Sequence, residues 1–403
     1  MTAAATATPA PTATPRIALL DVLRGVAILG TLATNVWIFA APGSEARFLA
    51  DAAAVSATAD LSGGPVAVVV EAVFRFLANG KFLALLTVLF GVGLAIQHRS
   101  ALAGGRAWPG RYGWRALLLF VEGTLHFVLV FAFDVLMGYA VTALLVAWLL
   151  ARSERAQRVT MYAAGALHVV LMTLLTLALA LAPPTGEPGS ATEEAAPARL
   201  FTEGSYLAQV DFRLVNWLPL RAEPILSFAL LVFLFLLGVR LFRAGAFEAD
   251  DRGRTVRRRL LRLGLGVGLP LNAATTLAGP ELFLIDRYVC APLLALGYLG
   301  LVGVLLEHRS RSGPVTAGLT AVGRTALSSY VLQNVLCVVL CYGWGLGLAS
   351  AWPGAEPWWV LALWAGVSGT LVLVARWWTA RFGRGPLEAA QQAALRRLER
   401  RRS

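Results

Sequence analysis

A series of apolar runs of membrane length, separated by short polar loops, sets the main constraint on the fold of this chain. A helix needs about 20 apolar residues to cross a bilayer. The runs are 16–40, 81–97, 114–133, 134–151, 159–182, 222–243, 260–279, 286–306, 323–345 and 357–377. A shorter piece, 64–78, leads to Asn79-Gly80 and is interpreted as a helical approach to the second span, or as a re-entrant segment. The runs predict an all-α, polytopic membrane helix bundle with about ten transmembrane helices.

Composition and domain organisation agree with a membrane protein. The chain is 58% hydrophobic and 14% charged, whereas soluble domains carry about 25% charged residues. Residues 1–15 are rich in Ala, Thr and Pro and are expected to form a disordered cytoplasmic tail. Residues 16–385 are predicted to form a single integral membrane domain, and 386–403 a basic cytoplasmic helix.

The formal net charge of +12 follows a topological pattern. Arginine is concentrated in loops 98–115, 152–158, 240–262 and 307–324, whereas each of the alternate loops 41–63, 183–221 and 279–287 carries more acidic than basic residues. The positive-inside rule then places both termini in the cytoplasm. The charge therefore indicates contact with the lipid bilayer rather than with nucleic acid. We expect a multi-pass protein of the inner (plasma) membrane.

Cysteine and histidine usage predicts neither a disulfide nor a metal site. Cys290, Cys337 and Cys341 all lie inside apolar segments and are interpreted as small core residues. No two histidines have the spacing of metal ligands.

The first apolar run carries charged residues near its start. Asp21 and Arg24 are three residues apart, so they lie on one helix face and can pair. Asn35 follows towards the outer end. The pair is either an anchor at the membrane boundary or the cytoplasmic floor of a polar cavity inside the bundle. Exposing a charged side chain to lipid is costly. If the pair lies within the membrane, it is therefore expected to pack against other helices.

The third run carries the strongest candidate for chemistry. Arg115, Glu122 and His126 fall within about 40° of one another on a helix, and Asp134 follows at the outer turn. Three ionisable groups on one face of a membrane helix are expected to face the interior of the bundle. A neutral histidine with a carboxylate partner suits a general base, so His126 is the predicted base, with Glu122 and Asp134 as its partners. The alternative is a polar staple that only fixes helix packing.

Two further runs carry polar candidates. Lys81 enters the second span from the outer side, where it either extends to the interface or meets an anionic substrate. In the ninth run, Arg324 and Ser328 lie one turn apart near the cytoplasmic end, and Gln333 belongs to a second polar stripe. Amides in membrane helices commonly join helices, and otherwise line a polar cavity.

Several short motifs occur in order along the chain and resemble those of one family. They are L-D-x-L-R-G-x-A-I-L-G at 20–30 with Asn35, K-F-x-x-L-x-x-x-L-F-G at 81–91, G-x-x-H at 123–126 with Asp134 and Tyr139, G-R-T-A-L-S-S-Y-x-L-Q at 323–333, Y-G-W-G-L-G-L at 342–348 and F-G-R-G-P-L-E at 382–388. This series resembles the YeiB-like bacterial inner-membrane proteins. The C-terminal half, about 222–385, resembles the domain of unknown function 418.

The resemblance extends to membrane acyltransferases. The L-D-x-x-R-G pattern of the first helix is similar to that of the heparan glucosaminide acetyltransferase relatives and the acyltransferase-3 group, which move an acyl group from cytoplasmic acyl-CoA to an acceptor. The acetyltransferase relatives carry a key histidine in the loop after that helix. Residues 41–63 contain none, so His126 would have to take that role.

These features lead to one functional expectation and two alternatives. The resemblance implies transfer of an acyl group from acyl-CoA, as a co-substrate and not as a bound cofactor, to a small-molecule, lipid or glycan acceptor near the outer side. The expected substrate contacts are Asp21, Arg24, Asn35, Lys81, Arg115, Tyr139, Arg324, Ser328 and Gln333. The first alternative is a transporter or flippase of a small anionic or lipid-like molecule, and the second is a structural envelope protein. Oligomers are compatible with all three.

Overall fold

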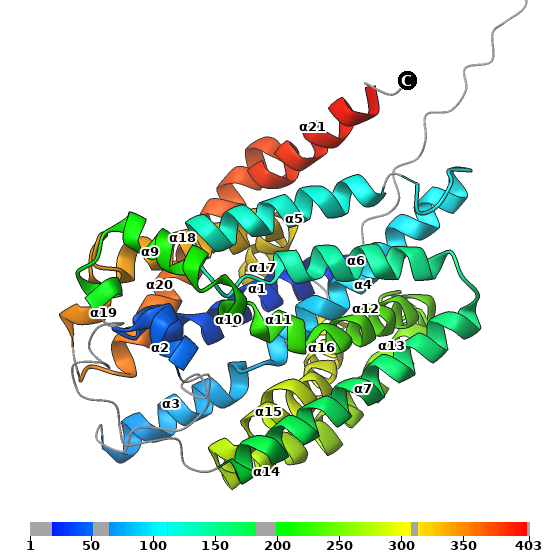
Figure 1. Ribbon diagram of the computed structural model, residues 1–403. Helices are drawn as coiled ribbons and strands as arrows, with labels where there is room; N and C mark the ends of the chain where they lie inside the picture. Colours follow the sequence, from blue (N-terminus) through cyan, green and yellow to red (C-terminus); the bar gives the residue numbers. More distant parts are fainter. Residues whose placement is uncertain are drawn as a thin grey trace, which may run out of the picture.

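The computed structural model describes residues 18–50, 64–110, 112–182, 199–307, 313–352 and 354–400. Within these residues it is a bundle of helices without a β-strand (Figure 1), which confirms the predicted all-α fold. Six helices are long and apolar enough to cross a membrane, or seven if one sharply bent pair counts as a single span. The predicted tail 1–15 lies outside the described residues.

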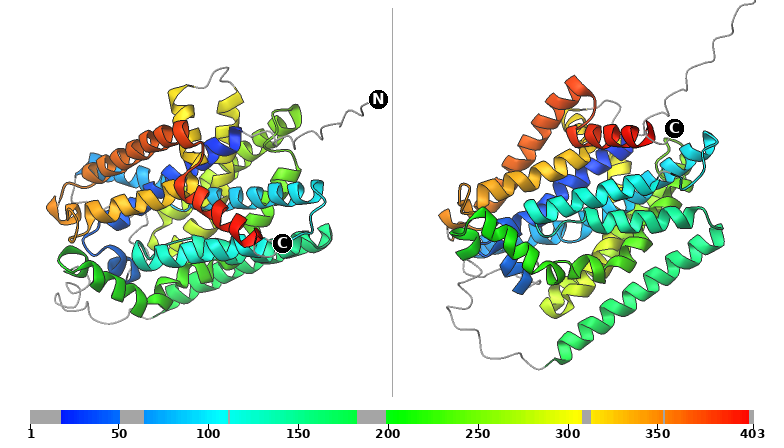
Figure 2. Two further views of the ribbon diagram at one scale, coloured as in Figure 1. Left: turned by 90° about the horizontal axis from the view of Figure 1, so that it is seen from above. Right: turned by 45° about the horizontal axis from the view of Figure 1, so that its top comes forward.

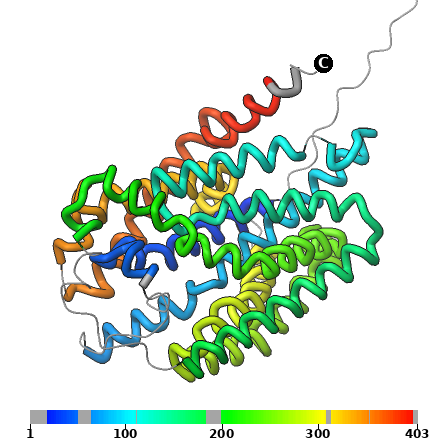
Figure 3. Tube along the Cα trace, in the orientation of Figure 1, coloured from blue at the N-terminus to red at the C-terminus, as the bar shows by residue number. Residues whose placement is uncertain are grey.

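Each predicted apolar run overlaps at least one helix of the bundle. Figure 3 follows the helices along the chain from blue to red. Their bounds are α1 (Ala18–Ala40), α2 (Ser44–Ala50), α3 (Pro65–Ala78), α4 (Lys81–Ala103), α5 (Tyr112–Leu129), α6 (Leu136–Leu150), α7 (Glu154–Leu181), α9 (Tyr206–Val215), α10 (Trp217–Leu220), α11 (Ala222–Leu226), α12 (Phe228–Arg243), α13 (Asp251–Leu263), α14 (Leu269–Ala278), α15 (Phe283–Ile285), α16 (Ala291–Glu307), α17 (Pro314–Arg324), α18 (Ala326–Cys341), α19 (Leu348–Ala351), α20 (Trp358–Phe382) and α21 (Pro386–Arg400). Short π-helical turns at Gly264–Gly268 and Asp286–Cys290 lead into α14 and α16.

Helix α1 runs through the centre of the bundle (Figures 1 and 2) and packs against α4, α17, α18 and α20. Its side chains are buried almost all round the helix, among them Leu23, Ile28 and Leu32. A helix that is apolar on every face is expected at the core of a large bundle. Polar groups carried by α1 are therefore held inside the protein.

Helix α7 lies at the opposite extreme, along one edge of the bundle (Figure 2). Only 17% of its most apolar window is buried inside the protein. Large apolar side chains such as Leu167, Val170, Leu174 and Leu177 are exposed along it. Such a surface matches the lipid phase of a membrane, where backbone groups are satisfied within the helix itself.

The break between α3 and α4 confirms the interpretation of 64–78 as a helical approach interrupted at Gly80. Gly80 has a positive φ of 75°, which a residue without a Cβ atom adopts readily. A Cβ atom there would also lie 2.7 Å from the carbonyl oxygen of Arg287. The break therefore lets the backbone of a later helix approach the start of α4.

The ninth run, predicted as one span over 323–345, consists mainly of α18, and its first two residues end α17. Residues 314–322, which were predicted to lie in a loop, form the rest of α17, and α17 meets α18 at a bend of 93°. At Gly323, near the end of α17, a Cβ atom would overlap the carbonyl oxygen of Asp21. Helix α17 thus crosses α1 in close backbone contact, and α18 turns away to run through the bundle.

The cysteines are free and buried, as predicted. Cys337 and Cys341 pack in an apolar cluster with Phe39, Phe131 and Tyr342, near the end of the bundle where α1 finishes. The positive-inside rule predicts that this is the outer end.

Candidate functional site

His126 is buried on α5 and contacts α18. Its side chain lies with Nε2 3.1 Å from Nδ2 of Asn334, and its ring centroid is 5.4 Å from that of Tyr330. Nδ1 is 3.7 Å from Oδ1 of Asp134 and has no hydrogen-bond partner among the described residues. The histidine and the aspartate that the sequence singled out are therefore neighbours, at a distance slightly beyond a hydrogen bond.

Asp134 lies in the turn between α5 and α6, and its carboxylate is buried. Oδ2 accepts hydrogen bonds from the backbone N–H groups of Leu136 and Met137, at 3.0 and 3.4 Å. The hydroxyl of Tyr330 donates to Oδ1 at 3.4 Å. These donors fix the carboxylate at the start of α6, where negative charge is also favoured by the helix dipole.

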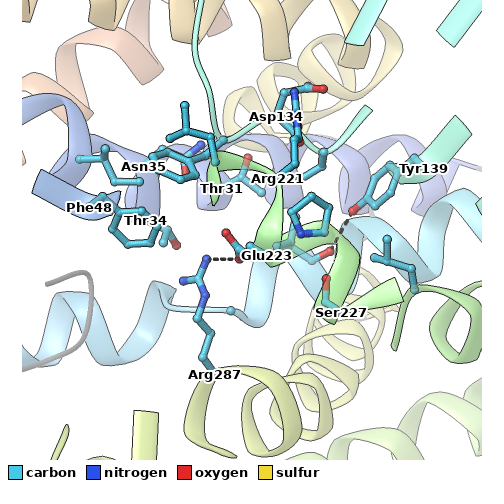
Figure 4. A pocket seen from close by; sticks show the side chains of 18 of the residues that line it. Thr31, Thr34, Asn35, Phe48, Asp134, Tyr139, Arg221, Glu223, Ser227 and Arg287 are labelled. Carbon is cyan, nitrogen blue, oxygen red and sulfur yellow. Dashed lines mark hydrogen bonds and ion pairs between the residues drawn. The ribbon is translucent and has the colours of Figure 1, made fainter. Parts of the chain in front are cut away.

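A cavity opens beside Asp134, at the end of the bundle where α1 finishes (Figure 4). The space is about 820 Å³, counting its opening to the outside. Its polar lining comes from Thr31, Thr34, Asn35, Asp134, Tyr139, Arg221, Glu223, Ser227, Arg287 and Tyr330. Apolar side chains such as Ile38, Phe48 and Phe133 complete it. An apolar cleft with a few converging polar groups is the common form of a small-molecule site.

Arg221 enters the cavity between α10 and α11 and is only 6% exposed. Its Nη1 donates to the backbone oxygen of Asp134 at 2.8 Å, and its guanidinium lies 4.0 Å above the ring of Phe127. Burial lowers the pKa of Arg221 below its ordinary value, and the charge of Asp134 opposes this. The side chain nevertheless stays a cation, because arginine is not deprotonated in proteins.

Across the cavity from Arg221 lies a second charged group (Figure 4). Arg287 donates from Nη2 to Oε1 of Glu223 at 3.0 Å, and from Nη1 to Oδ1 of Asn79. The hydroxyl of Tyr288 also donates to Oε1 of Glu223, at 2.8 Å. This pair joins the break before α4 to α11 and to the π-helical turn ahead of α16.

Of the predicted substrate contacts, Asn35 and Tyr139 line the cavity together with Asp134. The hydroxyl of Tyr139 is 2.6 Å from that of Thr87 on α4, so it is held on that side. His126 is not a lining residue and lies behind Asp134. The structure thus gives the cavity-facing position to the aspartate rather than to the histidine.

Asp21 and Arg24 stay apart from the cavity. Nη1 of Arg24 lies 3.7 Å from Oδ1 of Asp21, and both residues lie in the first two turns of α1. Asp21 is buried where α17 crosses, while the side chain of Arg24 is 31% exposed. The pair occupies the end of α1 opposite to Asn35, where the sequence placed a cytoplasmic floor.

The three ionisable groups of α5 do not share one environment, in contrast to the expectation that all three look into the bundle. Arg115 is exposed and His126 is buried. Glu122 is half-buried, and its carboxylate accepts a hydrogen bond from Gln391 of α21 at 3.2 Å. The cause is the position of α5 at the bundle edge, where α21 packs against it.

The remaining predicted residues occupy two other places. Arg324, the last residue of α17, donates to the carbonyl oxygen of Gly383 just after α20, and Ser328 of α18 donates to Glu388 of α21. Lys81 and Gln333 are fully buried inside the bundle. Nζ of Lys81 lies 4.6 Å from the ring centroid of Phe76.

Seven polar residues of the cavity were not predicted as site residues: Thr31, Thr34, Arg221, Glu223, Ser227, Arg287 and Tyr330. Arg221 and Arg287 were assigned to outer loops, where charge was interpreted only as topology. A usable signal was present, because Arg221 and Glu223 immediately flank the start of an apolar run. Charges at such a boundary either face water or turn into the bundle, and sequence alone does not separate the two.

Comparison with known proteins places the chain among uncharacterized relatives. It is 26% identical to the uncharacterized protein YxaH of Bacillus subtilis (strain 168) over 397 residues, which covers 93% of this chain and 92% of that protein. It is 28% identical to the uncharacterized protein YeiB of Escherichia coli (strain K12) over 348 residues, which covers 81% of this chain and 84% of that protein. Residues 241–397 match the model of the family described as "Protein of unknown function (DUF418)". The predicted resemblance to the YeiB-like proteins is therefore confirmed, and the C-terminal part of this chain is similar to the DUF418 family.

Proposed function

We propose that this protein is an acyltransferase of the inner membrane that uses the cavity beside Asp134 to bind its acceptor. The observation that carries the proposal is the buried pair of Asp134 and His126, whose carboxylate side lines the cavity. A carboxylate next to an imidazole inside a largely apolar cleft is a suitable general base. The resemblance of the first helix to membrane acyltransferases supports the same reaction class.

In this reaction, Asp134 accepts the proton of the acceptor hydroxyl or amine as its oxygen or nitrogen attacks the acyl carbonyl. The new ester or amide bond forms while the carbon–sulfur bond of acyl-CoA breaks. The CoA thiolate leaves, and the proton is released to water or to that thiolate. His126 serves as a positioning residue, since it touches Asp134 but does not line the cavity.

The donor is proposed to bind from the cytoplasmic side. Arg115 is exposed near the start of α5, where it is available to attract the phosphates of CoA. His126 lies eleven residues further along α5, about 16 Å at 1.5 Å per residue. The pantetheine arm of CoA covers this distance inside the bundle and brings the thioester to the acceptor in the cavity.

The test is acyl transfer by the purified protein, with a radiolabelled acyl-CoA and a lipid and glycan extract as acceptor. Labelled product that depends on the wild-type protein supports the proposal. If Asp134→Asn forms no product but has the same midpoint of thermal unfolding as the wild type, Asp134 is the general base. Full activity in both Asp134→Asn and His126→Ala would remove this mechanism.

A second candidate function is the movement of an anionic or lipid-like molecule through the membrane. It is favoured by the paired charges of Arg287 and Glu223 inside the bundle, since buried charges in membrane proteins often mark a translocation path. Transport of a labelled anionic lipid in proteoliposomes without acyl-CoA would favour this function. Acyl transfer that requires acyl-CoA would favour the first.

A further inference from the structure

We infer that the cavity beside Asp134 and an apolar chamber next to it together bind an anionic amphiphile, a molecule with a carboxylate or phosphate head and a hydrocarbon chain. Arg221 would hold the head, and the chamber would hold the chain. Binding of this kind goes beyond acyl transfer. That such a molecule is also the acyl acceptor is a further step that rests on the proposed function.

One edge of the Arg221 guanidinium is unused by the described residues. Its Nη1 is used by the backbone of Asp134, and its flat face is covered by Phe127. Nε and the other terminal nitrogen, Nη2, are buried and have no hydrogen-bond partner in the part of the chain that the structure describes. These two N–H groups are parallel, and they match the two oxygens of a carboxylate or phosphate.

The nearby carboxylates are already committed to other donors. Asp134 accepts from two backbone N–H groups and from Tyr330. Glu223 accepts from Arg287 and Tyr288. Neither carboxylate is hydrogen-bonded to the free edge of Arg221. A buried cation with two unused donors is costly, so a ligand that supplies two oxygens is expected to bind there.

The apolar chamber suggests the rest of the ligand. It measures about 850 Å³ with its opening and lies against Met172, Leu175, Leu226, Phe283 and Leu284. It shares the lining residues Phe48, Phe133, Leu220, Glu223 and Ser227 with the cavity. The two spaces therefore adjoin, and a head at Arg221 leaves room for a chain that runs towards the lipid-exposed helix α7.

The probe for this inference is dodecyl phosphate, with dodecanol as its uncharged match and inorganic phosphate as its chainless match. Full-length protein in a non-ionic detergent is heated with each compound, and the midpoint of unfolding is recorded over a range of concentrations. Dodecyl phosphate is expected to raise the midpoint, and the two matches are expected to have little effect. Dodecanoate and a short-chain phosphatidylglycerol, tested in parallel, distinguish a carboxylate head from a lipid phosphate.

Variants assign the two halves of the site. Arg221→Gln, and Arg221→Lys, which keeps the charge but loses the paired edge, should each weaken dodecyl phosphate binding at least tenfold. Leu226→Trp fills part of the apolar chamber without changing Arg221, and it should also weaken dodecyl phosphate binding. Arg240→Gln is the matched control, because Arg240 is an exposed arginine of α12 that does not line either space. It should bind like the wild type.

Several results would overturn the inference. An equal shift with dodecanol would mean that the head is not recognised, and an equal shift with inorganic phosphate would mean that the chain is not. Wild-type affinity in Arg221→Lys or in Leu226→Trp would do the same, even if Arg221→Gln failed to fold. Binding without any acyl transfer would refute the proposed function and leave this inference standing. Acyl transfer together with no shift by dodecyl phosphate would refute this inference and leave the proposed function standing.

Discussion

Arg213 and Glu45 form a two-point ion pair that is completely shielded from solvent. Nε and Nη2 of the arginine donate to Oε2 and Oε1 of the glutamate at 2.9 and 2.8 Å, and both side chains are 0% exposed. Burial lowers the pKa of Arg213, but the charge and hydrogen bonds of Glu45 outweigh this and raise it above its ordinary value. The pair ties α9 to α2, and Tyr342 donates to the same glutamate at 2.8 Å.

The first prediction concerns the stability that depends on this pair. Glu45→Gln leaves the guanidinium of Arg213 buried without its counter-charge. Removing one partner of a buried pair costs about 3–5 kcal/mol, so the variant should unfold at a clearly lower temperature in detergent. The measurement is the midpoint of thermal unfolding, followed by intrinsic tryptophan fluorescence.

The matched control is Glu154→Gln. Glu154 lies 3.8 Å from Arg243, but their side chains are 79% and 36% exposed. An exposed pair is worth about 0–1 kcal/mol, so this variant should unfold like the wild type. Equal changes of the unfolding midpoint in the two variants would show that the buried Arg213–Glu45 pair stabilises the protein no more than the exposed pair does.

The second prediction concerns the proposed general base. Asp134→Asn keeps the size of the side chain but removes its charge, so acyl transfer should fall by about 10²–10⁴-fold. The same substitution type at Glu203→Gln, an exposed carboxylate outside the cavity, should leave the rate unchanged. The measurement is the initial rate of labelled product with both substrates saturating. A loss below tenfold in Asp134→Asn would contradict a general-base role.

The fold was largely predictable because it depends on the apolar runs. The break at Gly80 and the turn that holds Asp134 were also predictable, since Asn-Gly and a charged residue between two apolar runs interrupt membrane helices. The bend between α17 and α18 was not predictable. It lies next to a backbone contact between Gly323 and Asp21, which are far apart in the sequence.

The site was predictable only in part. Pairing between His126 and Asp134 follows from helix geometry, because both flank the same turn. The positions of Arg221 and Glu223 could not be predicted in this way, because nothing in the local sequence decides whether a charge at the start of an apolar run faces water or the bundle. Glu122 was predicted to belong to the site but contacts Gln391 of α21 instead. Its surroundings depend on how α21, which is far away in the sequence, packs against α5.

The third prediction concerns the docking of α21. Glu388 accepts hydrogen bonds from the backbone N–H groups of Leu327 and Ser328, at 2.9 and 3.3 Å, and from the hydroxyl of Ser328. It therefore caps the first turn of α18. Glu388→Ala should weaken docking by about 0.5–2 kcal/mol, the usual value of a helix cap.

Limited proteolysis with trypsin measures this docking, because α21 contains Arg396 and Arg397. Cleavage in α21 should be faster in Glu388→Ala than in the wild type. Ala390→Ser, on an exposed position of the same helix, should be cleaved at the wild-type rate. Unchanged cleavage in Glu388→Ala would mean that other contacts hold the helix.

The fourth prediction concerns the crossing of α1 and α17. A Cβ atom at Gly323 would overlap the carbonyl oxygen of Asp21, and backbone atoms cannot move aside as a flexible side chain can. Gly323→Ala should therefore separate the two helices and destabilise the protein by about 1–3 kcal/mol, as overpacking does.

Gly366→Ala on α20 is the control, since a Cβ atom there meets nothing within 4 Å. In a helix interior, alanine is more favourable than glycine by about 1 kcal/mol, so the control should be as stable as the wild type or more so. Thermal unfolding in detergent measures both. A Gly323→Ala variant as stable as the control would mean that the crossing of α1 and α17 tolerates a methyl group.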